Sequence, residues 1–324
     1  MFIKREKLAI ITAVYLLLLQ LTVHAQTIND WENPQLVSQN TMPPHAHLIP
    51  YGDEKQALQK GSSPFIQSLD GTWKFTLVNT VAERPIEFYK NNFDTRQWKD
   101  IKVPANWQTE GFDKFIFTDV EYPIKPNPPY VPTDFNPVGS YKRNFTVPAT
   151  WSGNNIFIHL GAVNSFFYIW INGKYVGLSK DSKTPAEFDI TKFVQKGQNT
   201  VSIQVFRFSD GTYLEGQDMW KLSGIERSVY LIARPVLSVY DFFINAALDD
   251  AYKDGLLSVD VSMNTAPVAA TGFVEIKLLD NENKTILQQQ QPLANKSSYH
   301  FAATIPSVRQ WNAEHPELYS LLIN

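Results

Sequence analysis

The sequence predicts an all-β protein built from two successive β-sandwiches. Two observations carry this prediction. Aromatic residues make up 13% of the 324 residues and prolines number 20, a composition typical of strands and turns rather than long helices. In addition, apolar and polar residues alternate through many short segments, which is the period of a half-buried strand.

Composition and charge exclude several classes of protein. Hydrophobic residues make up 44% of the chain and charged residues only 19%, so a sizeable core can form and wholesale disorder is excluded. The net charge of −3 argues against a nucleic-acid partner, which would require a basic surface. The chain has no cysteine, which excludes disulfides, thiol catalysis and cysteine-ligated metals.

Residues 1–25 are predicted to be a signal peptide. Lys4, Arg5 and Lys7 form a basic head before the apolar run 8–23, and cleavage is expected after Ala25. The alternative is a single membrane anchor, since the run is only slightly shorter than a membrane span. With cleavage, we expect an exported protein without membrane attachment, in a bacterial periplasm or outside the cell.

An extended arm and a first sandwich are expected to follow. Residues 26–51 show no sustained period and are predicted to form the arm, and residues 52–235 the first sandwich. Within it, Asn172-Gly173 between apolar runs predicts a hairpin, and six prolines between Pro123 and Pro137 predict a rigid loop. The predicted strands are residues 71–77, 139–147, 155–160, 165–171, 187–190, 199–208 and 228–232, at a spacing typical of a jelly roll.

The second sandwich is predicted over residues 236–324, after a linker at 233–235. Alternating segments at 256–263, 272–279, 285–290 and 299–305 suggest an immunoglobulin-like sandwich without the cysteine pair of antibody domains. A last apolar strand begins at Leu318 and is expected to lack a partner, so that the sandwich is truncated before its last strand. Because unpaired edges recruit other chains, we expect residues 26–324 to self-associate and a version ending near Pro235 to be more soluble.

Spacing alone reveals little catalytic chemistry. The sequence contains no dinucleotide-binding glycine motif, phosphate-binding loop, nucleophile elbow or zinc-protease motif. His45 and His47 could project from one side of a strand, but no acidic residue lies close in sequence. We therefore expect them to be solvated loop histidines rather than metal ligands.

The densest polar cluster is Ser209–Trp220, which holds three carboxylates, a tyrosine and a tryptophan. Such a set suits a sugar or cation site, because carboxylates accept hydrogen bonds from hydroxyls and aromatic faces stack on sugar rings. The alternative is an acidic loop with a turn at residues 210–211. Glu215 and Asp218 could approach the separation of a retaining glycosidase pair, but no neighbour is expected to bury either. No catalytic residue is therefore assigned.

Residues 210–220 and 223–229 closely resemble the glycoside hydrolase family 2 β-galactosidases. Further motifs of this family occur in the same order along the mature chain. They are Asp30–Pro34 in the arm, Leu69–Phe75 in a first core strand, Val103–Gln108, the proline loop at Tyr122–Pro132, Asn164–Phe166, the hairpin turn at 172–173, and Trp311–Tyr319.

The resemblance implies a function that needs residues outside this chain. In the family, both catalytic glutamates stand on a (β/α)₈ barrel after the immunoglobulin-like domain. We therefore expect the N-terminal sugar-binding and scaffold portion of a retaining β-galactosidase, inactive alone, whose parent hydrolyses terminal β-D-galactosides and can be a homo-oligomer. The alternatives are a β-glucuronidase or β-mannosidase of the same family, or a stand-alone carbohydrate-binding module.

The resemblance also implies two substrate-binding residues. Asp218 corresponds to the family aspartate that binds galactose and a sodium ion. Asp119 stands where the family usually has an asparagine that touches the sugar; it keeps a hydrogen-bond acceptor but lacks the amide donor. Since one wall of a pocket offers few hydrogen bonds, galactose affinity is expected to be millimolar or weaker.

A magnesium site between arm and sandwich is the last implied feature. Its positions correspond to Asp30, Asn33, a carbonyl near Leu36, Lys180 and Asp210. Lys180 stands where the family has a glutamine, and an ammonium is a donor that repels a divalent cation. We hypothesise that Lys180 replaces the metal by neutralising Asp30 and Asp210 directly.

Overall fold

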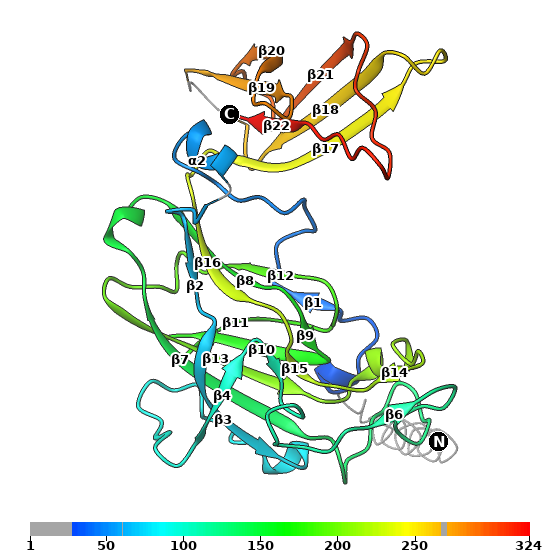
Figure 1. Ribbon diagram of the computed structural model, residues 1–324. Coiled ribbons are helices and arrows are strands. Elements are labelled where there is room, and N and C mark those ends of the chain that lie inside the picture. Colours follow the sequence, from blue (N-terminus) through cyan, green and yellow to red (C-terminus); the bar gives the residue numbers. More distant parts are fainter. Residues whose placement is uncertain (1–27, 60, 267–270) are drawn as a thin grey trace, which may run out of the picture.

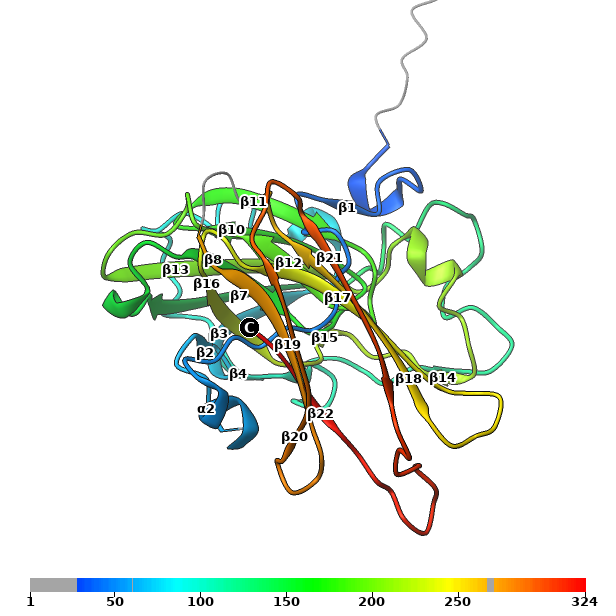
Figure 2. The same cartoon turned by 90° about the horizontal axis from the view of Figure 1, so that it is seen from above.

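The computed structural model describes residues 28–59, 61–266 and 271–324 and is almost entirely β (Figure 1). A large sandwich is joined by a narrow waist to a smaller one, and the arm runs between them. Seen from above, the smaller sandwich lies across the larger one (Figure 2). The predicted signal peptide lies outside the described residues. Within the described ranges, no helix is long and apolar enough to cross a membrane.

The first sandwich consists of two antiparallel sheets. The seven-stranded sheet has the order β1-β11-β10-β13-β7-β3-β4, and the four-stranded sheet β12-β8-β16-β2. Their inward-facing residues form one core around Trp73, Phe75, Trp107 and Tyr141, as alternation predicts. The strands are β1 (Ser38–Gln39), β2 (Ile66–Ser68), β3 (Gly71–Val78), β4 (Lys99–Val103), β7 (Val138–Thr146), β8 (Asn155–Leu160), β10 (Phe166–Ile171), β11 (Lys174–Ser179), β12 (Ala186–Asp189), β13 (Gln198–Phe206) and β16 (Val229–Arg234).

Short elements decorate this sandwich and position the candidate sites. Two-residue strands form a ribbon of β6 and β14 and a small sheet of order β5-β15-β9. The only α-helix of the described residues is α2, which the sequence pattern did not predict. The bounds are η1 (Asp30–Glu32), α2 (Glu54–Gln59), β5 (Ala105–Asn106), η2 (Val81–Glu83), β6 (Phe117–Thr118), η3 (Ala149–Trp151), β9 (Val163–Asn164), η4 (Asp210–Tyr213), β14 (Met219–Trp220) and β15 (Gly224–Ile225).

The second sandwich packs two three-stranded sheets, β17-β18-β21 and β20-β19-β22. Its small core gathers around Val259, Ile276, Tyr299 and Phe301. The strands are β17 (Val239–Leu248), β18 (Gly255–Met263), β19 (Phe273–Leu279), β20 (Thr285–Pro292), β21 (Ser298–Ile305) and β22 (Ser320–Ile323).

The expectation that the last strand lacks a partner is wrong. β22 pairs antiparallel with β19, with Ile323 opposite Ile276 and Ser320 opposite Leu279. The pairing joins segments far apart along the chain, which local sequence pattern cannot reveal. β22 is nevertheless the edge of its sheet, so the expected self-association stays a prediction.

The predicted hairpin is confirmed and the predicted linker needs correction. Asn172 and Gly173 both adopt positive φ, at 51° and 78°, and connect β10 to β11. In contrast, residues 233–234 are buried at the end of β16, where Ala233 pairs with Ile156. The strand predicted to end at Ile232 therefore continues through Arg234.

The arm pairs with the first sandwich through β1 and β11 and also contacts the second. The Tyr240 hydroxyl of β17 donates to the Pro43 carbonyl at 2.7 Å, and the Ala46 amide donates to the Asp241 carboxylate at 2.8 Å. Further along, the Lys277 ammonium of β19 lies 2.5 Å from the Glu54 carboxylate of α2. The residues that precede the first sandwich thus fill the waist between the two.

Candidate functional site

The ribbon of β6 and β14 brings Asp119 and Asp218 together. Met219 pairs with Thr118 and Trp220 with Phe117. Continuing this antiparallel register by one residue places Asp119 opposite Asp218, just beyond the end of the ribbon. Both side chains are exposed, and neither carboxylate accepts a hydrogen bond from the described part of the chain. Two residues from distant segments therefore form one acidic ribbon tip.

A buried arginine fixes the base of this ribbon. Arg207, only 2% exposed, forms an ion pair with Asp113. Its other terminal nitrogen donates to the Lys114 carbonyl at 3.3 Å and the Lys221 carbonyl at 3.1 Å, one just before β6 and one just after β14. Because one guanidinium holds both strands, Arg207 positions the ribbon tip. Sequence reasoning missed this residue, since its partners lie 14 and more positions away.

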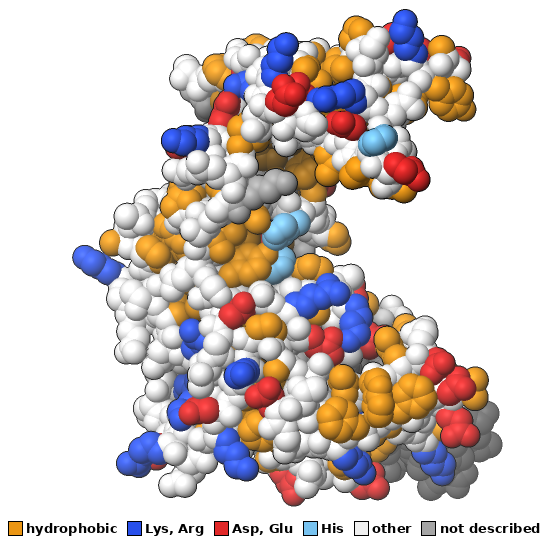
Figure 3. All heavy atoms as spheres, viewed as in Figure 1, with side chains coloured by type: hydrophobic (Ala, Val, Ile, Leu, Met, Phe, Trp, Pro, Cys, Tyr) orange, Lys and Arg blue, Asp and Glu red, His pale blue; other side chains and the backbone are white. Residues whose placement is uncertain are grey.

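Exposed apolar side chains surround the acidic tip. Trp220 lies edge-on to Phe117 and Phe115, with ring centroids 5.3 and 5.9 Å apart. All three rings are more than half exposed, and Val120 is 90% exposed. On the face shown in Figure 3, hydrophobic side chains gather at the lower right, in the part of the molecule that carries β6 and β14 in Figure 1. Carboxylates beside exposed aromatic faces suit a sugar ring.

The small sheet next to the ribbon depends on a glycine. Gly224 has φ of 130°, and a Cβ there would lie 2.8 Å from the Ala105 carbonyl oxygen. Only glycine combines this backbone conformation with so close an approach. The strand β15 that follows Trp220 is thereby held against β5 and β9.

Glu215 is less exposed than the sequence suggested. Its carboxylate accepts a hydrogen bond from the Ser182 hydroxyl at 2.9 Å, and burial raises the pKa of this carboxyl. The expectation that no neighbour buries Glu215 or Asp218 is therefore wrong for Glu215. Asp218 remains exposed, so the two do not share one enclosed site.

A second cluster joins the arm to the jelly roll through Lys180. Its ammonium donates to both oxygens of the Asp210 carboxylate, at 2.8 and 3.0 Å, to the Asn33 carbonyl at 2.7 Å and to the Asp30 carbonyl at 3.3 Å. The expected contact with Asp210 is present. The expectation that Lys180 also neutralises the Asp30 carboxylate directly is wrong. That carboxylate accepts a hydrogen bond from the Tyr168 hydroxyl at 2.7 Å instead.

These residues do not fit the magnesium ion that the resemblance implies. The Lys180 side chain is 5% exposed and its ammonium already lies among the oxygens that a metal would need. The Asn33 side-chain oxygen accepts from the Gln35 amide at 3.1 Å instead. No group of three or more His, Asp or Glu side chains suited to a metal occurs among residues 28–59, 61–266 and 271–324.

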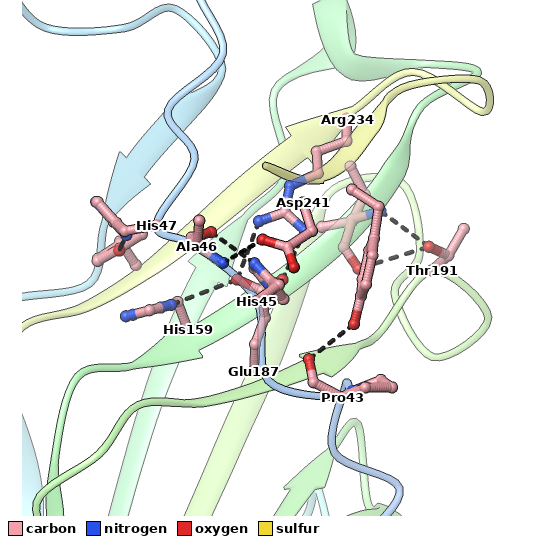
Figure 4. Close-up of polar contacts among 12 residues, drawn as sticks. Pro43, His45, Ala46, His47, His159, Glu187, Thr191, Arg234 and Asp241 are labelled. Atoms are coloured by element: carbon pink, nitrogen blue, oxygen red, sulfur yellow. Dashed lines mark hydrogen bonds and ion pairs between the residues drawn. The ribbon is translucent and has the colours of Figure 1, made fainter. Parts of the chain in front are cut away.

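His45 lies in a buried polar cluster, contrary to expectation, whereas His47 beside it stays exposed (Figure 4). Glu187 of β12 lies 3.2 Å from His45 Nε2 and 3.4 Å from His159 Nδ1, and both its oxygens accept from Arg234 at 2.7 and 3.1 Å. Figure 3 shows histidine side chains at the surface of the hollow between the sandwiches. His47 packs edge-on against His159, with centroids 5.7 Å apart.

Charge and burial act differently on these groups. The hydrogen bond to Glu187 raises the pKa of His45, whereas burial lowers the pKa of His47. Although burial raises the pKa of Glu187, hydrogen bonds from His159 and His45 and the charge of Arg234 hold it well below its usual range. The prediction of a solvated histidine failed for His45 because its acidic partner is 142 positions away, whereas His47 is exposed as expected.

A groove of about 1040 Å³ lies apart from the ribbon tip, between the arm and the proline loop. Trp31, Arg84 and Tyr130 are among its lining residues, and neither Asp119 nor Asp218 is. The Glu32 side chain links the arm to the proline loop at this groove, since its carboxylate accepts a hydrogen bond from the Val131 amide at 3.1 Å. We interpret the groove as the seam along which the arm docks.

Sequence comparison shows bacterial relatives. Similar proteins include the β-galactosidase of Priestia megaterium, 38% identical over 94% of this chain and 31% of the relative. The β-galactosidase of Photobacterium profundum is 39% identical over 91% of this chain and 29% of the relative. The chain thus spans about three tenths of the length of the curated relatives it matches.

Solved structures share the fold. The β-glucuronidase of an uncultured Clostridium sp. has a TM-score of 0.58 at 20% identity, covering 80% of this chain and 42% of that one. The Bacteroides uniformis β-glucuronidase has a TM-score of 0.62 at 24% identity, covering 79% and 30%. Residues 66–235 match the family described as glycosyl hydrolases family 2, sugar binding domain, and residues 237–324 match glycosyl hydrolases family 2. Because these two matches extend through both sandwiches, the chain belongs to glycosyl hydrolase family 2.

Proposed function

We propose that this chain forms the sugar-binding wall and scaffold of a retaining β-galactosidase, whose catalytic glutamates stand on a (β/α)₈ barrel elsewhere in the whole protein. The register of β6 and β14 carries this proposal, because it sets Asp119 opposite Asp218 at an exposed tip among aromatic rings. The relatives named β-galactosidase, at 38 and 39% identity, support the choice of reaction.

The chemistry of the tip suits a neutral sugar. Two carboxylates accept hydrogen bonds from neighbouring hydroxyls, and the exposed faces of Phe117 and Trp220 offer stacking surface. Asp218, with Asp119 opposite, also offers the oxygen ligands that a sodium ion prefers. A bound sodium would offset the repulsion between the carboxylates and polarise a sugar hydroxyl.

The same charges argue against a β-glucuronidase. A glucuronide carries its own carboxylate, which Asp119 and Asp218 would repel. Lys221 follows the ribbon directly, and its ammonium donates to the Gln217 carbonyl. Burial lowers the pKa of Lys221, and the charge of Asp218 partly offsets this effect. This single nearby cation does not reverse the charge of a tip that bears two carboxylates. The glucuronidase structures share less than 25% identity and support the fold alone.

Export and assembly belong to the same proposal. The basic head and apolar run of residues 1–25 support secretion of the parent enzyme with cleavage after Ala25. Mass spectrometry of the secreted protein tests this, with an N-terminus at Gln26 as the expected result. The family resemblance supports a homo-oligomeric parent in which the arm joins an interface, and light scattering of the whole protein tests that assembly.

A titration of the isotope-labelled chain followed by NMR tests the binding wall. Methyl β-D-galactoside should shift the amide signals of residues 117–119 and 218–220 at millimolar concentration, because one wall supplies few hydrogen bonds. Asp218→Asn should abolish these shifts, whereas Glu110→Gln, at an exposed position, should leave them unchanged. Methyl β-D-glucuronide should shift them less. Micromolar binding would favour a stand-alone carbohydrate-binding module instead.

A further inference from the structure

We infer that the Lys180 ammonium is a built-in cation that anchors the arm without metal, and that Lys180→Gln alone converts its oxygen cage into a divalent-cation site. The inference starts from the contacts of one atom. Four oxygens lie within 3.3 Å of the Lys180 nitrogen, and they come from two distant segments, Asp210 and the turn of residues 30–33.

The surrounding atoms are of the kind that a hard divalent cation binds. A carboxylate and two backbone carbonyls are oxygen ligands typical of magnesium and calcium sites. Both Lys180 and Asp210 are nearly buried, at 5 and 10% side-chain exposure. A positive charge is therefore required at this point, because an uncompensated buried carboxylate is costly. The ammonium meets that need and uses its three donors on these oxygens.

A metal and this ammonium cannot share the cage. The ammonium offers no lone pair to a cation, and two positive centres at such short range repel strongly in a buried site. The family's metal position is thus filled by a covalently attached charge. Arm docking should consequently be independent of divalent ions.

The cage is part of a larger anchor. The Lys180 backbone amide donates to the Val37 carbonyl at 3.0 Å, next to the pairing of β1 with β11. Next to Asp30 in the chain, Trp31 stacks on Phe206 with centroids 4.9 Å apart. Loss of the cation should loosen this segment of the arm first, because its charge is the only link between residues 30–33 and Asp210 among the described contacts.

Thermal unfolding with and without Mg²⁺ tests the inference. The unchanged chain should melt at the same temperature in EDTA and in Mg²⁺. Lys180→Gln should melt at a lower temperature in EDTA. About a 100-fold excess of Mg²⁺ over its Kd should then raise its Tm by roughly 5–10 °C. The matched control is Lys196→Gln, at an exposed turn position, which should remain insensitive to Mg²⁺.

Two further measurements locate the effect. Limited proteolysis should cut the arm of Lys180→Gln in EDTA and spare it in Mg²⁺. Adding Asp210→Asn to Lys180→Gln should abolish the Mg²⁺ response. If Lys180→Gln does not fold, calorimetric titration of the unchanged chain still decides, since no Mg²⁺ binding that depends on Asp210 is expected. Saturable Mg²⁺ binding by the unchanged chain that Asp210→Asn abolishes, or a folded Lys180→Gln that ignores Mg²⁺, would overturn the inference.

Discussion

Replacing Glu187 by glutamine should be among the most destabilising single changes in the jelly roll. Glu187 is 6% exposed and accepts two hydrogen bonds from Arg234, which is 5% exposed and stacks over Phe157 at 4.8 Å. Glutamine keeps the shape but removes the charge, so that Arg234 becomes a buried charge without compensation. Breaking a buried pair in this way costs about 3–5 kcal/mol.

Urea denaturation followed by tryptophan fluorescence measures this cost. A loss of about 3 kcal/mol should lower the midpoint of unfolding by at least about 1 M urea. Glu110→Gln removes the same charge from an exposed position and should change stability by less than about 0.5 kcal/mol. The reasoning fails if Glu187→Gln costs no more than this control.

Three further predictions concern the waist, the small sheet and catalysis. His45→Gln should destabilise most below about pH 6.5 and progressively less as pH rises through the raised pKa of His45. The reason is that the attraction of protonated His45 to Glu187 outweighs the repulsion from Arg234 and the effects of the neighbouring His159, Tyr240 and Asp241. A loss of stability that is the same at about pH 6 and pH 9 would contradict this. Gly224→Ala should cost more than Gly153→Ala in urea denaturation, since both have positive φ but only Gly224 lacks space for a Cβ; equal costs would show that the close approach is unimportant. The purified chain should not hydrolyse nitrophenyl β-galactoside, because the exposed pair at the ribbon tip does not form an acid and nucleophile pair; turnover that Asp218→Asn abolishes would refute this.

Local pattern revealed much of the fold. The alternation of residues 71–77 and 256–263 predicted β3 and β18 nearly to the residue. The Asn172-Gly173 turn was equally readable, because its backbone conformation depends on those two residues. In contrast, the partner of β22 was not readable, since strand pairing is decided by packing between segments far apart in sequence.

In the candidate sites, too, local sequence pattern revealed some features and missed those that depend on contacts between distant segments. The acidic cluster of residues 209–220 was visible in the sequence, but its pairing with Asp119 depends on the ribbon register. Arg207 reads as an ordinary strand-end residue until its carbonyl partners are known. His45 looked like a loop histidine because Glu187 belongs to another part of the chain. Buried polar networks draw their members from several elements, so no local pattern announces them.

Transfer into a complete enzyme tests the central claim most directly. A full-length β-galactosidase of the family can receive residues 28–324 of this chain in place of its own corresponding segment. With the parent's oligomeric state retained, the chimera should hydrolyse nitrophenyl β-galactoside and leave the β-glucuronide intact. Asp218→Asn should lower kcat/KM about 10- to 100-fold, the loss expected for one charge-assisted hydrogen bond to the sugar, and Glu110→Gln should have no effect. An assembled chimera without galactosidase activity, or one indifferent to Asp218→Asn, would contradict the assignment of the ribbon tip as a sugar-binding wall.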